Sequence, residues 1–165
     1  FNNFTSLNWM KNMLSFIGDY TCKLDSKGRL VVPAVFRKEM QAGQEGSFVL
    51  QRNIFETCID VYPKGEWLRL VEELRAKLSP FNQEHMRFRR GFFHGALEVE
   101  LDANGRILIP RKMLEQVAIE GDEIVVVGLD SKIEIWDKIK YEEGAMSTEE
   151  FVLLTDKLNF GNLGL

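Results

Sequence analysis

Short segments in which apolar and polar residues alternate recur along the chain. Residues 20–24 alternate in this way, and an apolar run at residues 30–32 follows after a turn. Such alternation is typical of half-buried β-strands. The turn begins with Asp25, whose carboxylate can accept hydrogen bonds from the backbone two residues on, and ends with Gly28, which tolerates a positive φ. The pattern therefore predicts a β-hairpin.

The same pattern occurs twice. Residues 24–33 read Leu-Asp-Ser-Lys-Gly-Arg-Leu-Val-Val-Pro, and residues 101–110 read Leu-Asp-Ala-Asn-Gly-Arg-Ile-Leu-Ile-Pro, 77 residues further on. Self-similarity at one fixed spacing indicates a tandem duplication. Each proline is expected to open a short amphipathic helix, near residues 34–40 and 111–118, because proline is tolerated in a first helical turn. Each half then ends in two more strands, expected at residues 47–50 and 57–62 in the first copy and at 123–127 and 133–136 in the second.

Each half thus reads strand, strand, helix, strand, strand. A unit of under about 60 residues leaves too much apolar surface exposed to be stable alone. We therefore expect an α+β, mostly β fold in which the two halves share one core as a single pseudo-twofold β-barrel.

Three longer helices are predicted outside the repeats. Pro63 opens a helix over residues 64–78, and Asn82 can cap a second one that runs to Phe93. A capping-box pattern at residues 147–150 begins the last helix. Its apolar side chains are available to cover the barrel or a neighbouring subunit: Phe151, Val152, Leu154 and Leu158.

These elements suggest five segments. Residues 1–15 are expected to be a flexible N-terminal extension, and residues 16–63 form the first repeat. A helical connector spans residues 64–92, the second repeat spans residues 93–137, and a C-terminal helix with an acidic tail spans residues 138–165.

Composition excludes several classes of function. No apolar run is long enough to span a bilayer. The two cysteines, Cys22 and Cys58, have no CxxC spacing, which favours a reduced, cytoplasmic compartment. His85 and His94 do not have metal-ligand spacing, and no phosphate-binding glycine motif or nucleophile motif is present. We therefore expect no enzyme activity, no metal, no cofactor, no small-molecule substrate and no membrane partner.

Charge is distributed unevenly along the chain. The formal net charge is −4, but residues 115–165 hold four basic and twelve acidic residues, whereas residues 1–114 hold 17 basic and 13 acidic residues. The first part is therefore net +4 and the last part net −8. This asymmetry indicates a basic binding surface followed by an acidic segment.

The basic residues gather around the two turns. Arg29 and Arg106 each follow a tight turn, from which a guanidinium can reach a guanine edge or bridge phosphates in a DNA groove. Asp25, Gly28, Asp102 and Gly105 would shape the turns and orient the arginines. Alternatively, the Asp25–Arg29 and Asp102–Arg106 pairs only lock the turns, and the two roles are compatible. The candidate DNA-binding residues are Lys23, Lys27, Arg29, Arg37 and Lys38 in the first copy and Arg106, Arg111 and Lys112 in the second.

The two copies are not equivalent. Arg37 aligns with Leu114 and Lys38 with Glu115. Around the first motif, Asp25 and Glu39 appear as the only nearby acids. We therefore expect the first motif to dominate affinity and the second to complete the same basic face. A further basic group, Arg87, Arg89 and Arg90, is expected to face acids such as Glu98 or Glu100 while the neighbouring aromatics enter the core or a subunit seam.

The doubled motif, together with Phe16-Ile17-Gly18 before it, resembles the MraZ family of bacterial DNA-binding regulators, and each half resembles the AbrB-type swapped-hairpin module. The resemblance covers about residues 16–141. It implies a double-split β-barrel built from two AbrB-like β-β-α-β-β halves, in which Arg37 resembles a DNA-contacting position. It also implies a cytoplasmic, nucleoid-associated transcription factor. Such a factor assembles into a ring and binds short repeated promoter elements of the division and cell-wall gene cluster as double-stranded DNA.

A second function class remains open. The acidic C-terminal helices also suit a protein-interaction or antitoxin-like scaffold without DNA readout, with Phe160 and Leu163 as anchors. Substitution of Arg29 by alanine separates the two possibilities, because it should abolish promoter binding and leave a scaffold unaffected.

Overall fold

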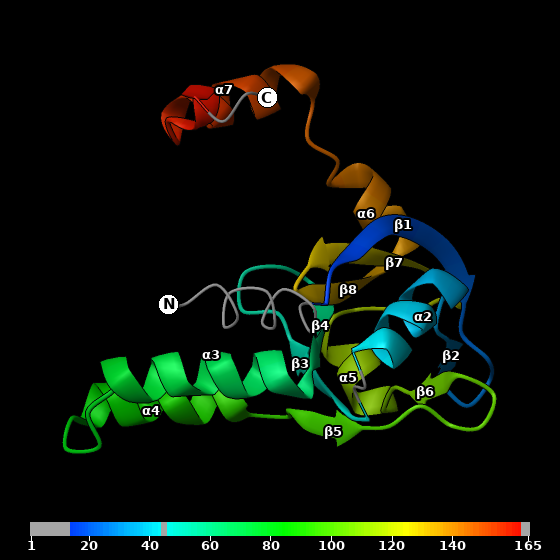
Figure 1. Ribbon diagram of the computed structural model, residues 1–165, viewed down its shortest axis with the longest axis horizontal. Coiled ribbons are helices and arrows are strands. Elements are labelled where there is room, and N and C mark those ends of the chain that lie inside the picture. The colour runs from blue at the N-terminus through cyan, green and yellow to red at the C-terminus, as the bar shows by residue number, and fades with distance from the viewer. Residues whose placement is uncertain (1–13, 44–45, 163–165) are drawn as a thin grey trace, which may run out of the picture.

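The computed structural model describes residues 14–43 and 46–162 (Figure 1). Most of the expected N-terminal extension and the anchor residue Leu163 lie outside these ranges. Ser15, the last residue of the expected extension, is tied to the body of the protein. Its backbone N–H donates to Glu39 Oε1 at 2.9 Å, and its hydroxyl donates to Asp130 Oδ1 at 2.6 Å. The described fold therefore includes Ser15.

Two antiparallel sheets form the body of the molecule. The larger has six strands in the order β1-β7-β8-β4-β3-β5, and the smaller pairs β2 with β6. In that order the six strands are β1 (Phe16–Lys23), β7 (Glu123–Asp130), β8 (Lys132–Asp137), β4 (Cys58–Pro63), β3 (Phe48–Arg52) and β5 (Leu97–Val99). The two strands of the smaller sheet are β2 (Arg29–Val31) and β6 (Arg106–Leu108).

The two halves of the chain are interlocked through these sheets. β1 pairs along its full length with β7, from Phe16 opposite Asp130 to Lys23 opposite Glu123, and β2 pairs with β6. The predicted hairpin forms only next to its turn, where a bridge joins Leu24 to Leu30 and Asp25 N–H donates to the Arg29 carbonyl at 3.0 Å. Further from the turn, the two arms pair with strands of the other repeat. Periodicity identifies a strand but does not identify its partner, and here the partner comes from the other repeat.

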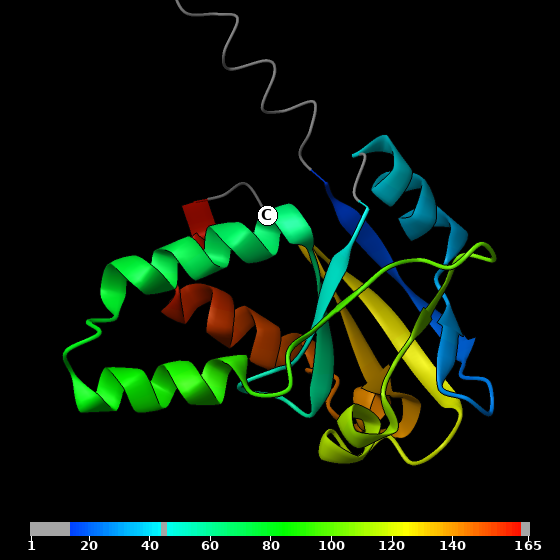
Figure 2. The same cartoon turned by 90° about the horizontal axis from the view of Figure 1, so that it is seen from below.

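One hydrophobic core serves both halves, as expected. Fully buried side chains from the first half, such as Phe36 and Leu50, pack in the same cluster as Ile109 and Ile135 from the second. The predicted closed barrel is not observed. The described strands form an open ladder with β1 at one edge and β5 at the other. Figure 2 shows the small sheet and the short helices beside the curved large sheet.

The short helices after the two prolines are confirmed. α2 (Ala34–Ala42) follows Pro33 and buries Phe36 and Met40, and α5 (Arg111–Gln116) follows Pro110 and buries Met113. α5 ends two residues earlier than expected, before Ala118, which adopts a left-handed φ of 51°.

A helical hairpin covers part of the other face of the large sheet. α3 (Lys64–Lys77) and α4 (Gln83–Phe93) form as predicted, and the Asn82 side chain caps α4 by accepting from His85 N–H. Trp67 stacks on Phe92 with ring centroids 5.7 Å apart, over Val49 of β3. Both helices extend beyond the sheet (Figure 1).

The expected contact of the α4 arginines with Glu98 is wrong. Glu98 accepts hydrogen bonds from Lys64 Nζ and from the Ser47 hydroxyl. In the part of the chain that the structure describes, no ion pair involves Arg87, Arg89 or Arg90. Lys64, at the start of α3, therefore takes the place beside Glu98, although α4 is the helix that directly precedes β5 in the sequence.

The chain ends in two helices and a short 3₁₀ turn. α6 (Lys138–Glu143) follows β8 directly, and α7 (Thr148–Lys157) begins at a complete capping box between Ser147 and Glu150. η1 (Phe160–Asn162) follows. α7 buries none of its residues and projects from the body (Figure 1), so it does not cover the sheet of its own chain. None of the described helices combines the length and apolar character that a bilayer crossing requires.

A buried polar network lies between β4 and β8. Asp60 is only 4% exposed, and Lys132 Nζ lies 2.7 Å from its Oδ1 and 3.2 Å from Glu134 Oε1. Asn53 also donates to Asp60, at 3.1 Å. Burial raises the pKa of Asp60. Burial alone would lower the pKa of Lys132, but the hydrogen bond and charge of Asp60 outweigh it and raise that pKa. One ammonium group therefore pairs with both carboxylates, of which Asp60 is buried and Glu134 is 12% exposed at its side chain.

Removal of this ammonium should be costly. We predict that Lys132→Met lowers the free energy of unfolding by about 3–5 kcal/mol, because Asp60 and Glu134 would remain buried without their cation. Urea unfolding followed by circular dichroism measures this change. The double variant Asp60→Asn/Lys132→Met should lose less than the sum of the two single variants. Lys157→Met on exposed α7 is the control, and a loss of under about 1 kcal/mol for Lys132→Met would contradict the prediction.

Candidate nucleic-acid interface

The first turn is built around the Asp25 carboxylate. Its Oδ1 accepts hydrogen bonds from the backbone N–H groups of Lys27 and Arg29, each at 2.9 Å, and its Oδ2 accepts from Arg29 Nε at 2.6 Å. Gly28 closes the turn at a φ of 80°, and its N–H donates to the Asp25 carbonyl at 3.0 Å. Asp25 therefore fixes both the turn and the direction of the Arg29 side chain.

The second turn repeats this geometry. Asp102 Oδ1 accepts from the N–H groups of Asn104 and Arg106 at 2.9 Å, and its Oδ2 accepts from Arg106 Nε at 2.7 Å. Gly105 has a φ of 70°. In the described residues, neither arginine uses its Nη amino groups in these pairs, so both keep donors for another ligand.

The small sheet places both arginines on one face. Arg29 lies opposite Leu108 and Val31 lies opposite Arg106 in the β2–β6 register. Because alternate residues of a strand share a face, these four residues point the same way. Leu30 and Ile107, on the other face, are buried. The exposed face of this two-stranded ribbon therefore carries two oriented arginines and two aliphatic side chains. We call these four residues the ribbon face.

Each turn is covered by the helix of the other half. A Cβ added at Gly105 would lie 2.7 Å from Arg37 Cδ, and one added at Gly28 would lie 2.8 Å from the Ile109 carbonyl and 3.7 Å from Leu114 Cδ1. Arg37, grouped with the first motif by sequence, thus packs on the second turn. Its Nε is buried and has no hydrogen-bond partner among the described residues.

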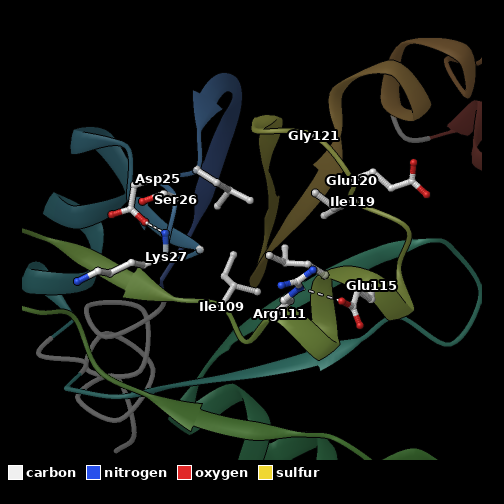
Figure 3. A pocket seen from close by; sticks show the side chains of 12 residues that line it. Asp25, Ser26, Lys27, Ile109, Arg111, Glu115, Ile119, Glu120 and Gly121 are labelled. Atoms are coloured by element: carbon white, nitrogen blue, oxygen red, sulfur yellow. Dashed lines mark hydrogen bonds and ion pairs between the residues drawn. The ribbon is translucent and has the colours of Figure 1, made fainter.

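A hollow of about 560 Å³ lies beside the first turn. Figure 3 shows Asp25, Ser26 and Lys27 on one side of it and Arg111 on the other. Glu115 and Glu120 also line this hollow, so the expectation of only two nearby acids is wrong. Glu115 pairs with Arg111, at 3.0 Å from Nε. These acids come from the second half and adjoin the first turn only because the halves interlock.

The remaining candidate lysines lie at the margins of this surface. Lys23 is exposed at the end of β1, opposite Glu123. Lys38 is exposed on α2, and Lys112 lines a separate hollow with His94 and Gln116. The structure therefore brings Lys27 and Arg111 to the first turn and Arg37 to the second. The ribbon face also includes Val31 and Leu108, which the charge pattern does not predict; each lies two residues after an arginine and two before a proline.

The aspartates of the two turns are strongly stabilised as anions. Hydrogen bonds from the Arg29 and Lys27 backbone and the Arg29 side chain lower the pKa of Asp25 to about 2 despite partial desolvation, with the Arg29 backbone bond as the largest cause. The equivalent contacts of Arg106 and Asn104 lower the pKa of Asp102. Both ion pairs are therefore complete at neutral pH.

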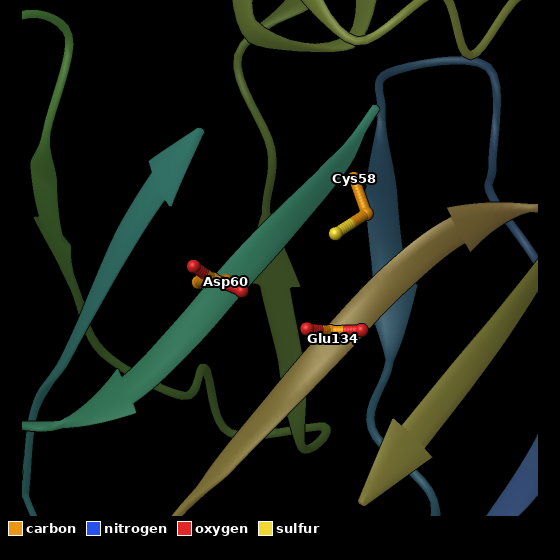
Figure 4. A group of neighbouring side chains, drawn as sticks. All are labelled: Cys58, Asp60 and Glu134. Atoms are coloured by element: carbon orange, nitrogen blue, oxygen red, sulfur yellow. The ribbon is translucent and has the colours of Figure 1, made fainter. Parts of the chain in front are cut away.

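The described residues contain one group with metal-ligating potential away from these turns. Cys58, Asp60 and Glu134 are all buried, with ligand atoms within 4.8 Å of one another (Figure 4). The Lys132 ammonium already lies within 3.2 Å of both carboxylates. Burial also raises the pKa of the Cys58 thiol, which opposes formation of the thiolate that binds metals. This group is best described as an ion-pair network.

The Asp25 titration tests the geometry of the first turn. A pKa below the ordinary value of about 3.9 means that the ionised carboxylate stabilises the folded turn above about pH 4, and that this contribution is lost as the pH falls toward 2. We predict a midpoint near pH 2 when the Asp25 carboxyl carbon is followed by NMR. In Arg29→Ala the midpoint should rise only partly, because the residue 29 backbone N–H still donates. A wild-type midpoint near 3.9 would contradict the geometry.

Comparisons with known proteins agree with this description. A family model described as "MraZ protein, putative antitoxin-like" matches the chain twice, over residues 15–91 and 92–153. The chain is 40% identical to the "Transcriptional regulator MraZ" of Bacteroides thetaiotaomicron over 139 residues, which cover 84% of this chain and 88% of the relative.

Two further relatives have similar identities. The proteins of the same name from Christiangramia forsetii and Clostridium acetobutylicum are 37% and 38% identical, over 88% and 87% of this chain and 94% and 96% of their own lengths. The relatives are named as regulators, which agrees with the expectation that the chain is not an enzyme. With two matches that together span most of its length, the chain belongs to the MraZ family and contains two copies of the family's repeat.

Proposed function

We propose that this protein is a sequence-specific DNA-binding transcriptional regulator that reads DNA with its ribbon face. The observation that carries the proposal is the shared orientation of Arg29 and Arg106 on one exposed face of the β2–β6 ribbon, each held by its aspartate through Nε. The relatives are named as transcriptional regulators, which supports the proposal.

The ribbon has the right shape and chemistry for a major groove. That groove admits a two-stranded β-ribbon, and arginine can donate two hydrogen bonds to O6 and N7 of guanine. The Nη groups of Arg29 and Arg106 are the donors for this contact. Val31 and Leu108, 52% and 53% exposed, can contact thymine methyl groups from the same face. Lys27, Arg37 and Arg111 flank the turns and are suited to phosphate contacts, with Lys23, Lys38 and Lys112 further out.

A single chain makes few phosphate contacts, so its affinity for one element should be weak and strongly dependent on salt. We propose that a ring-shaped homo-oligomer overcomes this weakness by binding several short promoter repeats at once. The targets would be promoter elements of the division and cell-wall gene cluster, and the protein would act in the cytoplasm, associated with the nucleoid.

A scaffold function without DNA readout is the second candidate. The description of the family model as antitoxin-like and the exposed apolar surface of α7 favour it. The two candidates differ in their dependence on the ribbon face, because a scaffold docked through α7 does not need Arg29 or Arg106.

Alanine substitution in the ribbon face tests the primary proposal. Arg29→Ala and Arg106→Ala should each weaken binding to DNA from upstream of the protein's own gene by about 1–3 kcal/mol, which is roughly 5- to 150-fold. Gel shifts across salt concentrations measure the loss. The larger effect should come from Arg29 if the first motif dominates. Arg69→Ala, on exposed α3 and already paired with Glu66, is the matched control. Unchanged binding of both ribbon variants would favour the scaffold.

The number of promoter elements in a DNA fragment tests the proposed ring. A promoter fragment with several correctly spaced elements should bind about 10²–10⁴-fold more tightly than a fragment with one. Insertion of about 5 base pairs between elements rotates them to opposite sides of the duplex and should remove most of this gain. Equal affinity for one and for several elements would rule out binding through multiple subunits.

A further inference from the structure

The helix α7 exposes several large apolar side chains. Residues 151–154 are Phe, Val, Leu and Leu, and because each residue of a helix is rotated by about 100° from the last, four in succession surround the axis. Phe151 is 59% exposed and Leu153 69% exposed. Large apolar side chains gathered on an exposed segment mark a surface that another element normally covers. Isolated helices of fewer than about 12–15 residues are also marginal in water, and α7 has ten residues.

α7 is held away from the rest of its own chain. The preceding helix α6 is pinned to the body, because Lys140 Nζ donates to the Ala118 carbonyl at 2.8 Å and the Tyr141 hydroxyl donates to Asp19 at 3.2 Å. Residues 144–146 alone link α6 to the capping box at Ser147. Figure 1 shows α7 and the α3–α4 hairpin well separated on the same side of the sheet. The short link favours an occupant from outside the chain.

The outer side of α4 combines an exposed aromatic side chain with a glycine, so the apolar side chains of α7 can pack against it. Phe88 is 48% exposed there, and a Cβ added at Gly91, on the same exposed face, meets no atom within 4 Å. A glycine inside a helix costs about 0.5–1 kcal/mol relative to alanine, and its small size lets a second helix approach closely. Arg87 and Arg90 lie exposed beside these two residues. We call these four residues the α4 surface.

α7 and the helical hairpin that carries the α4 surface have opposite net charges. α7 contains three acids, Glu149, Glu150 and Asp156, against Lys157, and is net −2. The hairpin of residues 64–93 contains seven basic and four acidic residues and is net +3. No ion pair inside the described part of the chain engages Arg87 or Arg90. Opposite charges around exposed apolar centres favour association of the two surfaces and oppose the pairing of like surfaces.

We propose that α7 of one copy docks on the α4 surface of a second copy. This inference rests on the oligomer in the proposed function and identifies its contact. α7 and the α4 surface are different parts of the molecule, so the contact is head-to-tail and can repeat from copy to copy until the ring closes. The acidic C-terminal segment then joins subunits and leaves the ribbon face of each one free for DNA.

Variants at each surface test the contact without disturbing the subunit. Phe151→Ser/Leu153→Ser removes two apolar side chains from α7. Gly91→Glu places a charged side chain on the α4 surface and blocks the approach of α7. Since α7 buries none of its residues and Gly91 has open space beside it, each variant should fold. Both should sediment at the mass of one chain at concentrations where the wild type is an oligomer. Phe55→Ser, which alters an 87% exposed aromatic in the β3–β4 loop, is the control and should stay assembled.

Mixing the two variants gives the decisive measurement. Each retains one intact surface, so an equimolar mixture should form a dimer through the single remaining contact and go no further. Docking of α7 on its own chain predicts that the mixture stays monomeric. A monomeric mixture, a monomeric wild type, or variants that remain fully assembled would each overturn the proposal.

Charge reversal tests the pairing of the two surfaces. Glu149→Lys/Asp156→Lys and Arg87→Glu/Arg90→Glu should each raise the subunit dissociation constant about tenfold or more, and their combination should recover most of the loss. Glu149 and Asp156 lie near opposite ends of α7, so the effects of these substitutions on the helix dipole offset each other. Failure of the combination to recover would contradict the pairing.

DNA binding is measured separately. The monomeric variants should still bind a single promoter element like the wild type and lose only the gain from several elements. If the wild type binds no element, the proposed function fails while the docking result stands. If single-element binding persists and assembly does not respond to the variants, the docking proposal alone fails.

Discussion

The shared core is the constraint on which the rest of the structure depends. Neither repeat can bury its own apolar residues, so each edge of one half is completed by the other. In the large sheet β1 pairs with β7, β4 with β8 and β3 with β5, and each of these pairs joins a strand of the first repeat to a strand of the second. The buried side chains of the two repeats form one cluster. The same exchange creates the candidate site, because β2 and β6 come from different repeats and form a ribbon only together. Stability and the ribbon face thus have the same physical origin.

Interlocking also explains the asymmetry of the two turns. A turn is flanked by the helix of the opposite repeat, so a substitution in one copy changes the surroundings of the other turn. Arg37 packs at Gly105, whereas its counterpart Leu114 packs at Gly28. The second turn therefore gains a cation from the first repeat, and the first turn gains Glu115 and Glu120 from the second. Each turn therefore comes from one repeat, and the charged residues beside it come from the other repeat.

Local signals in the sequence predicted local structure well. Pro33, Pro110, Asn82 and Ser147 each mark a helix start that the structure confirms, because proline geometry and side-chain caps act within one turn. The paired Asp and Gly residues likewise predicted both turns. Strand partners were not predictable, since alternation in β1 fits β2 and β7 equally well. The positions of Arg37 and Glu98 depend on those partners, and for that reason the sequence grouped both with the wrong neighbours.

The buried ion-pair network fixes the register of β4 against β8, which hydrophobic pairing alone does not. A strand of aliphatic residues can slip by two positions against its neighbour and keep the same faces buried. In the observed register Asp60 lies opposite Glu134, and Lys132 reaches both carboxylates. A slip of two residues would separate Asp60 from its ammonium and leave a buried charge without a partner, at a cost of several kcal/mol. β4 and β8 belong to different repeats. The network therefore favours the alignment of the two halves in which Arg29 lies opposite Leu108 and Arg106 lies opposite Val31.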